Sequence, residues 1–200
     1  MPSVNVLELP DAEAWESWLA ANGTTQTEAW LRIARRNSGA ALPMIHETLD
    51  VALCHGWIDG QRKACDALSF LQRYSRRRPR SSWSQVNVAK AEALIASGRM
   101  QAAGLAEVEA AKADGRWDAA YPSQRTPTVP PDLATALAGN ARASAAFESL
   151  GRSGRYAVIL PLLKARTPQA REQLLARAIN RLSGEDEVRT DLSEGPELPG

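Results

Sequence analysis

A proline-rich stretch that follows residue 121 divides the chain into two parts with different patterns. Four prolines lie between residues 122 and 131 of the 200-residue sequence. Proline lacks a backbone N–H and fixes φ, so regular helices and central strands do not continue through such a stretch. Strand-like and helical patterns alternate before it, and helical patterns alone follow it. The sequence therefore predicts an α+β fold, with a small antiparallel sheet of about three strands, packed helices and a helical C-terminal half.

The same patterns predict three segments. We expect residues 1–125 to form an α+β domain, residues 126–183 a helical region packed on it, and residues 184–200 an acidic disordered tail. A chain of this length buries about 70% of its unfolded surface, so folding needs no metal or disulfide.

Several classes of protein are excluded by what the sequence lacks. No run approaches the roughly 18 apolar residues of a membrane span, so we expect no membrane insertion. The N-terminus has neither a basic start nor an apolar core, so we expect no secretory signal. Cys54 and Cys65 form no CxxC motif, which predicts no structural metal, no cofactor and a reducing, cytoplasmic location.

The near-neutral total charge hides two charged segments. Residues 61–80 hold seven basic residues and one acidic residue, whereas residues 185–200 hold six acidic residues and one Arg. Arginine forms forked bonds to carboxylates and phosphates, so an arginine cluster is a candidate anion site. A solvated charged surface is the alternative interpretation.

Caps, stops and periodicity predict most elements. Asp11 and Ser84 are typical N-caps, Thr167–Pro168 is typical of a helix start, and Trp15 and Trp18 fall on one helix face as core residues. Residues 77–83 are expected to be extended because Pro79 disfavours helix before it. The predicted strands are 27–35, 57–64 and 68–76, and the predicted helices are 11–23, 45–54, 84–97, 100–113, 132–138, 141–150, 155–165 and 167–182.

The densest polar chemistry lies between Cys54 and Asn87. Two arginines that flank a proline in an extended segment point to the same side, and a helix N-terminus beside them offers free N–H groups to an anion. A carboxylate can orient an arginine fork, and tryptophans can provide stacking walls. The predicted binding residues are Trp57, Asp59, Arg78, Arg80, Ser82, Trp83 and Asn87. A structural ion-pair network with core tryptophans remains the alternative.

Catalytic chemistry has weaker candidates in the same region. Asp59, Cys54 and His55 have side chains suited to proton transfer or nucleophilic attack. His46 and Cys54 share a helix face, but eight residues separate them by about 12 Å, which is too far for a catalytic pair. A small buried cysteine is the alternative.

The basic segment at residues 61–80 also raises the possibility of nucleic-acid binding. Phe70, Tyr74 and Trp83 lie in or next to this segment, and basic strands with aromatic residues bind single strands. The chain has a net charge of +1 and no recognised motif, so we rank nucleic acid as an unlikely partner.

Several blocks of sequence resemble one known family. The blocks are ALCHGWIDG (52–60), RRPRSSWSQVN (77–87), LIASGRMQAAGL (94–105), DGRWDAAY (114–121), VPPDLATAL (129–137), ARASAAFESL (141–150) and GRYAVILPLLKARTPQAREQ (154–173). Together they are similar to the YdeI/OmdA family, described as bacteriocin-protection, YdeI or OmpD-associated, over roughly residues 12–183. Five of the candidates match its motif: Asp59, Arg78, Arg80, Trp83 and Asn87. The family pattern has Phe at the position of His55.

The resemblance implies a soluble bacterial stress protein linked to resistance against bacteriocins or cationic antimicrobial peptides. It assigns no catalytic residue. Three hypotheses follow: a protective protein that binds a small anionic or amphipathic molecule or a partner, an enzyme acting on a carboxylate or phosphate metabolite, and a nucleic-acid-binding protein. A cationic peptide is a further possible partner, which the acidic residues 184–200 would suit best.

Overall fold

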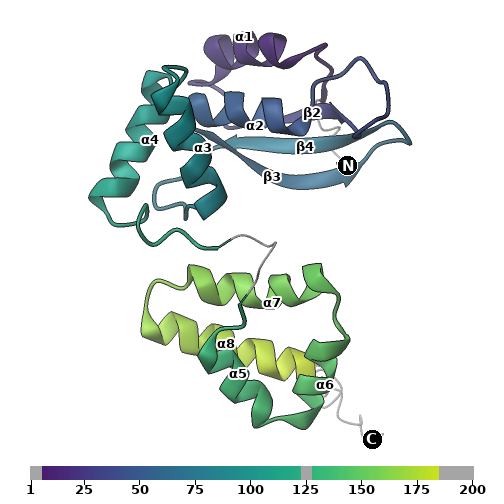
Figure 1. The fold of residues 1–200 in the computed structure, drawn as a ribbon, viewed down its shortest axis with the longest axis vertical. Coiled ribbons are helices and arrows are strands. Elements are labelled where there is room, and N and C mark those ends of the chain that lie inside the picture. The colour runs from purple at the N-terminus through teal and green to yellow at the C-terminus, as the bar shows by residue number, and fades with distance from the viewer. Residues whose placement is uncertain (1–5, 123–127, 185–200) are drawn as a thin grey trace, which may run out of the picture. The chain divides into compact units, whose positions relative to one another are not determined.

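The computed structural model describes residues 6–122 and 128–184 of the chain (Figure 1). The chain forms two compact units, residues 1–120 and residues 121–200, which we call unit 1 and unit 2. Unit 1 holds the strands together with helices, and the described part of unit 2 is helical, so the α+β prediction is confirmed. The predicted acidic tail lies outside the described residues, except for Gly184.

Unit 1 is built on a four-stranded mixed sheet in the order β1-β2-β4-β3. The predicted sheet of about three antiparallel strands lacked β1, which pairs parallel with β2. Two residues are too short to show an alternating pattern, which is why sequence reasoning missed that strand. The elements of unit 1 are β1 (Val6–Leu7), α1 (Ala12–Asn22), β2 (Glu28–Ala34), α2 (Ile45–Cys54), β3 (Trp57–Ala64), β4 (Ser69–Arg76), α3 (Gln85–Ala96) and α4 (Ala102–Ala113).

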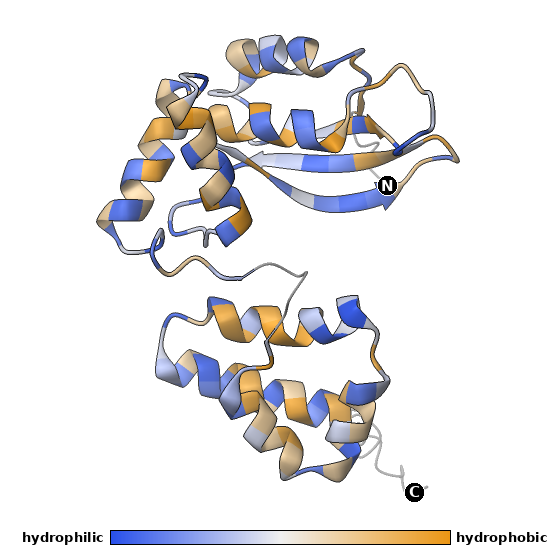
Figure 2. Cartoon of the chain, viewed as in Figure 1, coloured by the Kyte–Doolittle hydropathy of each residue, from blue (hydrophilic) through white to orange (hydrophobic). Residues whose placement is uncertain are grey.

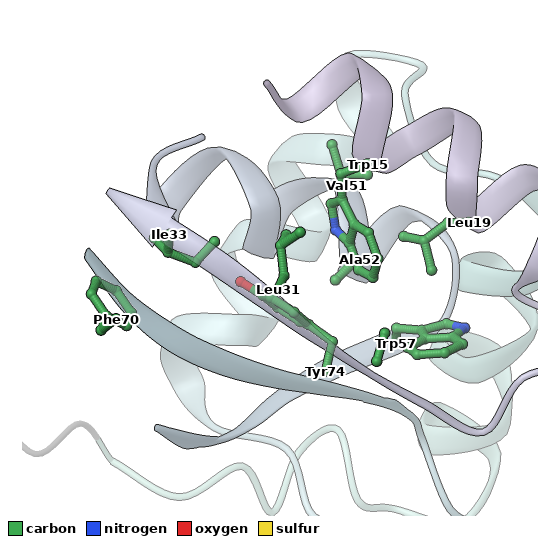
Figure 3. Packing of buried hydrophobic residues seen from close by; sticks show 10 residues of the cluster. Trp15, Leu19, Leu31, Ile33, Val51, Ala52, Trp57, Phe70 and Tyr74 are labelled. Carbon is green, nitrogen blue, oxygen red and sulfur yellow. The ribbon is translucent and has the colours of Figure 1, made fainter. Parts of the chain in front are cut away.

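Helices α1 and α2 lie on one face of the sheet (Figure 1). Figure 3 shows the side chains between them, where aromatic rings from three elements meet. Trp15 of α1 stacks on Trp18 and packs edge-on against Trp57 of β3. The hydroxyl of Tyr74 lies 2.7 Å from Thr48 Oγ1, so the polar end of this ring is satisfied inside the core.

Helices α3 and α4 form a second core cluster beside the sheet. Trp83 and Trp117 pack with their ring centroids 4.9 Å apart, against Ala91 of α3 and Val108 of α4. Gly104 allows α4 to approach the end of α2, because a Cβ at this position would lie 2.4 Å from the carbonyl oxygen of Cys54. Any larger residue would push the two helices apart.

The described part of unit 2 contains amphipathic helices around a mainly aliphatic core. Figure 2 shows a hydrophobic run in the C-terminal half of α7 and alternating colours along α8. Leu133, Phe147, Ile159 and Leu162 are buried together. The helices are α5 (Pro131–Ala138), α6 (Ala141–Ser149), α7 (Arg152–Lys164) and α8 (Pro168–Ser183).

Three helices begin directly after the N-cap residues that the sequence predicts. The side chains of Asp11, Ser84 and Thr167 accept bonds from the backbone N–H three residues later in α1, α3 and α8, which satisfies a free donor at each start. In the described part of the chain, no helix is long and apolar enough to cross a membrane.

Candidate functional site: an arginine-lined groove

A groove of about 400 Å³ lies where β4 ends and the chain continues towards α3. Its lining carries four guanidinium groups, one carboxylate and two hydroxyl groups. The lining residues are Thr27, Glu28, Arg73, Ser75, Arg76, Arg77, Arg78 and Pro79. We call this feature the arginine groove.

Strand pairing places the acidic residue of the groove beside its first arginine. Glu28 of β2 lies opposite Ser75 of β4, and Arg73 is two residues before Ser75, so its side chain leaves the same face of the strand. Arg73 donates from Nη2 and Nε to Glu28 Oε2 at 2.5 and 3.1 Å. Glu28 therefore holds this guanidinium in one position at the groove wall.

Arg77 is a buried arginine that connects the groove to the interior. Its guanidinium lies 3.5 Å from the ring centroid of Trp83 and donates to the carbonyl of Ser82 at 3.4 Å. A guanidinium is weakly hydrated and stacks on aromatic faces, so it tolerates this burial. Desolvation raises the pKa of Asp59, and the nearby charges of Arg62 and Arg77 partly oppose this rise.

The segment after Arg77 folds into a turn, where the sequence predicted an extended chain. Ser81 donates its N–H to the carbonyl of Arg78 at 2.9 Å, and the N–H of Arg78 donates to Ser81 Oγ at 3.0 Å. Arg80 has a φ of +65°. Pro79 is favoured at the second position of such turns, and the positive φ of Arg80 at the third position turns the chain where an extended segment was expected. Arg78 lines the groove, whereas Arg80 is not part of the lining.

A buried arginine that follows α4, Arg116, supports this turn. Arg116 donates to the carbonyl of Ser81 at 2.9 Å. Its Nε also bonds to the carboxylate of Asp114 at 2.7 Å. The turn that carries Arg78 is therefore tied to a distant part of unit 1.

The other predicted binding residues are dispersed around the groove. Trp57 is fully buried in the core of the sheet and donates to the carbonyl of Gly23 at 3.3 Å. Trp83 is 2% exposed, and it contacts Arg77 instead of facing the solvent. Asn87 lies in the first turn of α3, where its N–H bonds to the cap Ser84. These positions favour structural roles for both tryptophans and for the start of α3.

The residues predicted for catalysis do not line the groove. Burial raises the pKa of the Cys54 thiol, which disfavours the nucleophilic thiolate. Burial lowers the pKa of His55.

Asp50, which shares a helix face with His46, pairs with Lys90 at 2.5 Å. Among the described residues, no group of three His, Cys, Asp or Glu side chains could hold a metal ion.

Comparison with known families divides the chain in a similar way. Residues 7–107 match a family described as "Domain of unknown function (DUF8412)", which covers half of the chain. The chain belongs to this family. Residues 126–184 match a second family, described as "Bacteriocin-protection, YdeI or OmpD-Associated". No curated protein and no solved structure matches the chain.

The second match confirms the resemblance predicted from sequence, over a shorter range. The predicted resemblance ran over roughly residues 12–183, whereas the match to that family is confined to residues 126–184. All residues of the arginine groove fall inside the first match instead. The groove therefore lies in the part of the chain that matches the domain of unknown function, whereas the match to the OmpD-associated family lies within unit 2.

Sequence reasoning missed most of the groove. Arg73, Ser75 and Arg77 are spaced two residues apart at the end of a predicted strand, and that alternation places side chains on one face. This spacing indicates a shared face, whereas the predicted site centred on Arg78 and Arg80, which flank Pro79. The contributions of Thr27 and Glu28 depend on the pairing of β2 with β4, which the sequence does not specify.

Proposed function

We propose that the chain is a binding protein whose arginine groove holds a small molecule with a phosphate or carboxylate group. The observation that carries this proposal is a groove lined by four arginines and a single acidic residue, Glu28. Forked guanidinium donors match the geometry of carboxylate and phosphate oxygens. We further propose that this binding contributes to protection against bacteriocins or cationic antimicrobial peptides.

Arg78 is the arginine best placed to contact such a ligand. Its side chain is exposed, and its guanidinium makes no hydrogen bond or ion pair within the described residues. Glu28 already neutralises Arg73, and Arg76 donates to the carbonyl of Thr24 at 3.1 Å. A ligand anion would therefore bind first to Arg78, and the fixed guanidinium groups would supply a positive wall that needs no reorganisation.

Two alternatives have less support. An enzyme using Trp57, Asp59, Arg78 and Arg80 would need these groups in one pocket, but only Arg78 lines the groove. Nucleic-acid binding through residues 61–80 would need free basic side chains along the whole segment, but Arg73 pairs with Glu28. Arg62 and Lys63 instead lie over the rings of Phe70 and Trp30, at 4.2 and 4.4 Å from the ring centroids.

The protective role is supported by the description of the family that residues 126–184 match. The proposed cytoplasmic location is supported by the cysteines, because Cys54 and Cys65 are both free thiols, as is usual in reducing compartments. The ligand chemistry and the protective role can be tested separately.

The first test measures anion binding to the full chain by calorimetry, with inorganic phosphate, pyrophosphate and citrate as probes. Arg78→Gln should weaken binding about tenfold, because a charge-assisted hydrogen bond is lost. Arg80→Gln is the matched control, since it removes the same charge from the same turn but outside the lining. Glu28→Gln should strengthen binding, because it removes the acidic residue that repels the anion.

Two outcomes would reject the binding proposal. One is an absence of anion binding at low salt. The other is an equal loss in Arg78→Gln and Arg80→Gln, which would indicate general attraction to a basic surface. A second experiment compares survival of bacteria that express the chain or its Arg78→Gln variant when a cationic peptide is added. Equal survival of the two strains would show that the arginine groove does not contribute to protection.

A further inference from the structure

A second groove lies in unit 2, between α7 and α8, and it combines an apolar floor with two arginines. Its volume is about 300 Å³. Arg177 and Arg181 are exposed and lie one helical turn apart on α8, so they share one face. The remaining lining residues are Ala157, Val158, Pro161, Leu174 and Ala178. We call this feature the α7–α8 groove.

The two arginines of this groove have no partner within the described residues. Neither guanidinium forms a hydrogen bond or an ion pair there. Two other arginines of unit 2 do have partners. Arg171 forms an ion pair with Asp132, and Arg155 donates to the carbonyl of Leu150. Two adjacent free guanidinium groups beside an apolar floor indicate an occupant that is both acidic and partly hydrophobic.

A proline adds a backbone acceptor to the floor. Pro161 lies inside α7 and has no N–H, so the carbonyl of Ala157 lacks its usual donor four residues later. Both residues line the groove. An extended segment that enters the groove could donate a backbone N–H at this point.

The chain itself contains a segment with the required chemistry. Residues 185–200 carry six acidic residues and one Arg, with Val188, Leu192 and Leu198 among them. Residues 128–184 carry eight basic and three acidic residues. The two stretches therefore have opposite net charges of equal size, +5 and −5, and such complementarity favours their association.

The segment is also long enough and begins in the right place. It follows Gly184, which has a φ of +75° and ends α8 in the left-handed conformation, where chains commonly change direction. From Gly184 back to Leu174 the helix is about 15 Å long. About five extended residues cover that distance, and the segment has sixteen.

We propose that residues 185–200 bind in the α7–α8 groove of the same chain. The first acidic residues then pair with Arg181 and Arg177, and Val188 and Leu192 cover the apolar floor. Direct connection to α8 gives the segment a high effective concentration at the groove, so weak individual contacts suffice.

The test uses the full chain and measures cleavage by a glutamyl endopeptidase at Glu187, which occurs only in chains whose segment is released. Arg177→Gln with Arg181→Gln should increase the cleavage rate about fivefold, as expected for the loss of two exposed ion pairs. Salt at 0.5 M should increase cleavage of the unmodified chain in the same way. Arg152→Gln with Arg166→Gln removes the same charge elsewhere on unit 2 and should leave the rate unchanged.

A second measurement addresses the apolar floor. In nuclear magnetic resonance spectra, Leu192→Ser should shift the methyl signals of Val158 and Leu174, while Leu198→Ser tests the far end of the segment. A cleavage rate that does not respond to the arginine substitutions, or methyl signals that do not respond to Leu192→Ser, would overturn the proposal. Protection that rises with protein concentration would also overturn it, because the occupant would then be the segment of a second copy.

Discussion

The two units stabilise their interiors in different ways. Unit 1 buries aromatic rings together with polar side chains that have distant partners, such as Thr48 with Tyr74 and Arg116 with Ser81. Unit 2 buries aliphatic side chains and Phe147, and Ser183 is its buried polar side chain within residues 128–184. Directional polar bonds fix one arrangement of the chain, whereas apolar helix packing depends mainly on size and pattern.

The two grooves differ in the same way as the two interiors. The arginine groove depends on strand pairing and on a turn that Arg116 supports, so its shape rests on contacts between distant residues. The α7–α8 groove depends on two consecutive helices and on arginines one turn apart. We expect the first groove to be sensitive to substitutions far from its lining, and the second to be sensitive mainly to its own residues.

The largest effect should follow the loss of a core ring in unit 1. Trp15 is fully buried and donates from Nε1 to the carbonyl of Thr48 at 3.1 Å. Trp15→Ala should lower the free energy of unfolding by about 3–5 kcal/mol. Hydrogen exchange, measured residue by residue, should accelerate throughout the sheet of unit 1.

Leu162→Ala is the substitution in unit 2 that corresponds to Trp15→Ala, because the side chain of Leu162 is also fully buried. We expect a loss of about 2–5 kcal/mol and faster exchange in α5 to α8. If either substitution accelerated exchange equally in both units, the comparison would fail, because the chain would then unfold as a single cooperative structure.

The same contrast determines how much the sequence alone could predict. The helices of unit 2 match the predicted ranges to within three residues, because caps, prolines and apolar spacing are local signals. The caps Asp11 and Ser84 in unit 1 were predicted for the same reason. The groove was not, because the pairing of Glu28 with Arg73 and the burial of Arg77 depend on residues far apart in the sequence.

The turn at Pro79 illustrates this limit at a single position. The restriction that proline imposes on Arg78 is a local rule, and it predicted an extended segment. The observed turn is held by the side chain of Ser81 and by Arg116, which is 35 residues away from Ser81. Only the first of these partners is visible in the local sequence.

A smaller effect should follow a change at the contact between α2 and α4. Gly104→Ala places a methyl group 2.4 Å from the carbonyl oxygen of Cys54 and 2.7 Å from that of Leu53. Because backbone atoms cannot rotate away, we expect a loss of about 1–3 kcal/mol in thermal or urea denaturation. Gly139→Ala in unit 2 is the control, since its nearest neighbour lies at 3.6 Å. Similar losses of stability in the two variants would show that the close approach of α4 to α2 does not make Gly104 more sensitive to substitution than Gly139.

The smallest effect concerns the one ion pair that ties distant helices of unit 2 among the described residues. Arg171 of α8 holds both carboxylate oxygens of Asp132 in α5, at 2.6 and 2.9 Å, and donates to the carbonyl of Leu162 at 2.7 Å. The hydrogen bonds from Arg171 lower the pKa of Asp132 below its ordinary value. Since the pair is partly exposed, we expect Arg171→Gln to cost about 1 kcal/mol at neutral pH.

The pH dependence of the stability that this ion pair contributes is a sharper test than the loss of stability at neutral pH. A lowered folded-state pKa means that the stabilisation is complete above the unfolded value of about 3.9 and is lost as the pH falls through the folded-state pKa. Urea denaturation between pH 5 and pH 2 should therefore show a shallower loss of stability in Arg171→Gln than in the unmodified chain. Arg166→Gln, which removes an exposed charge from the same unit, should retain the original slope. If both variants flattened the slope equally, general charge repulsion would explain the acid sensitivity, and unit 2 would rest on apolar packing alone.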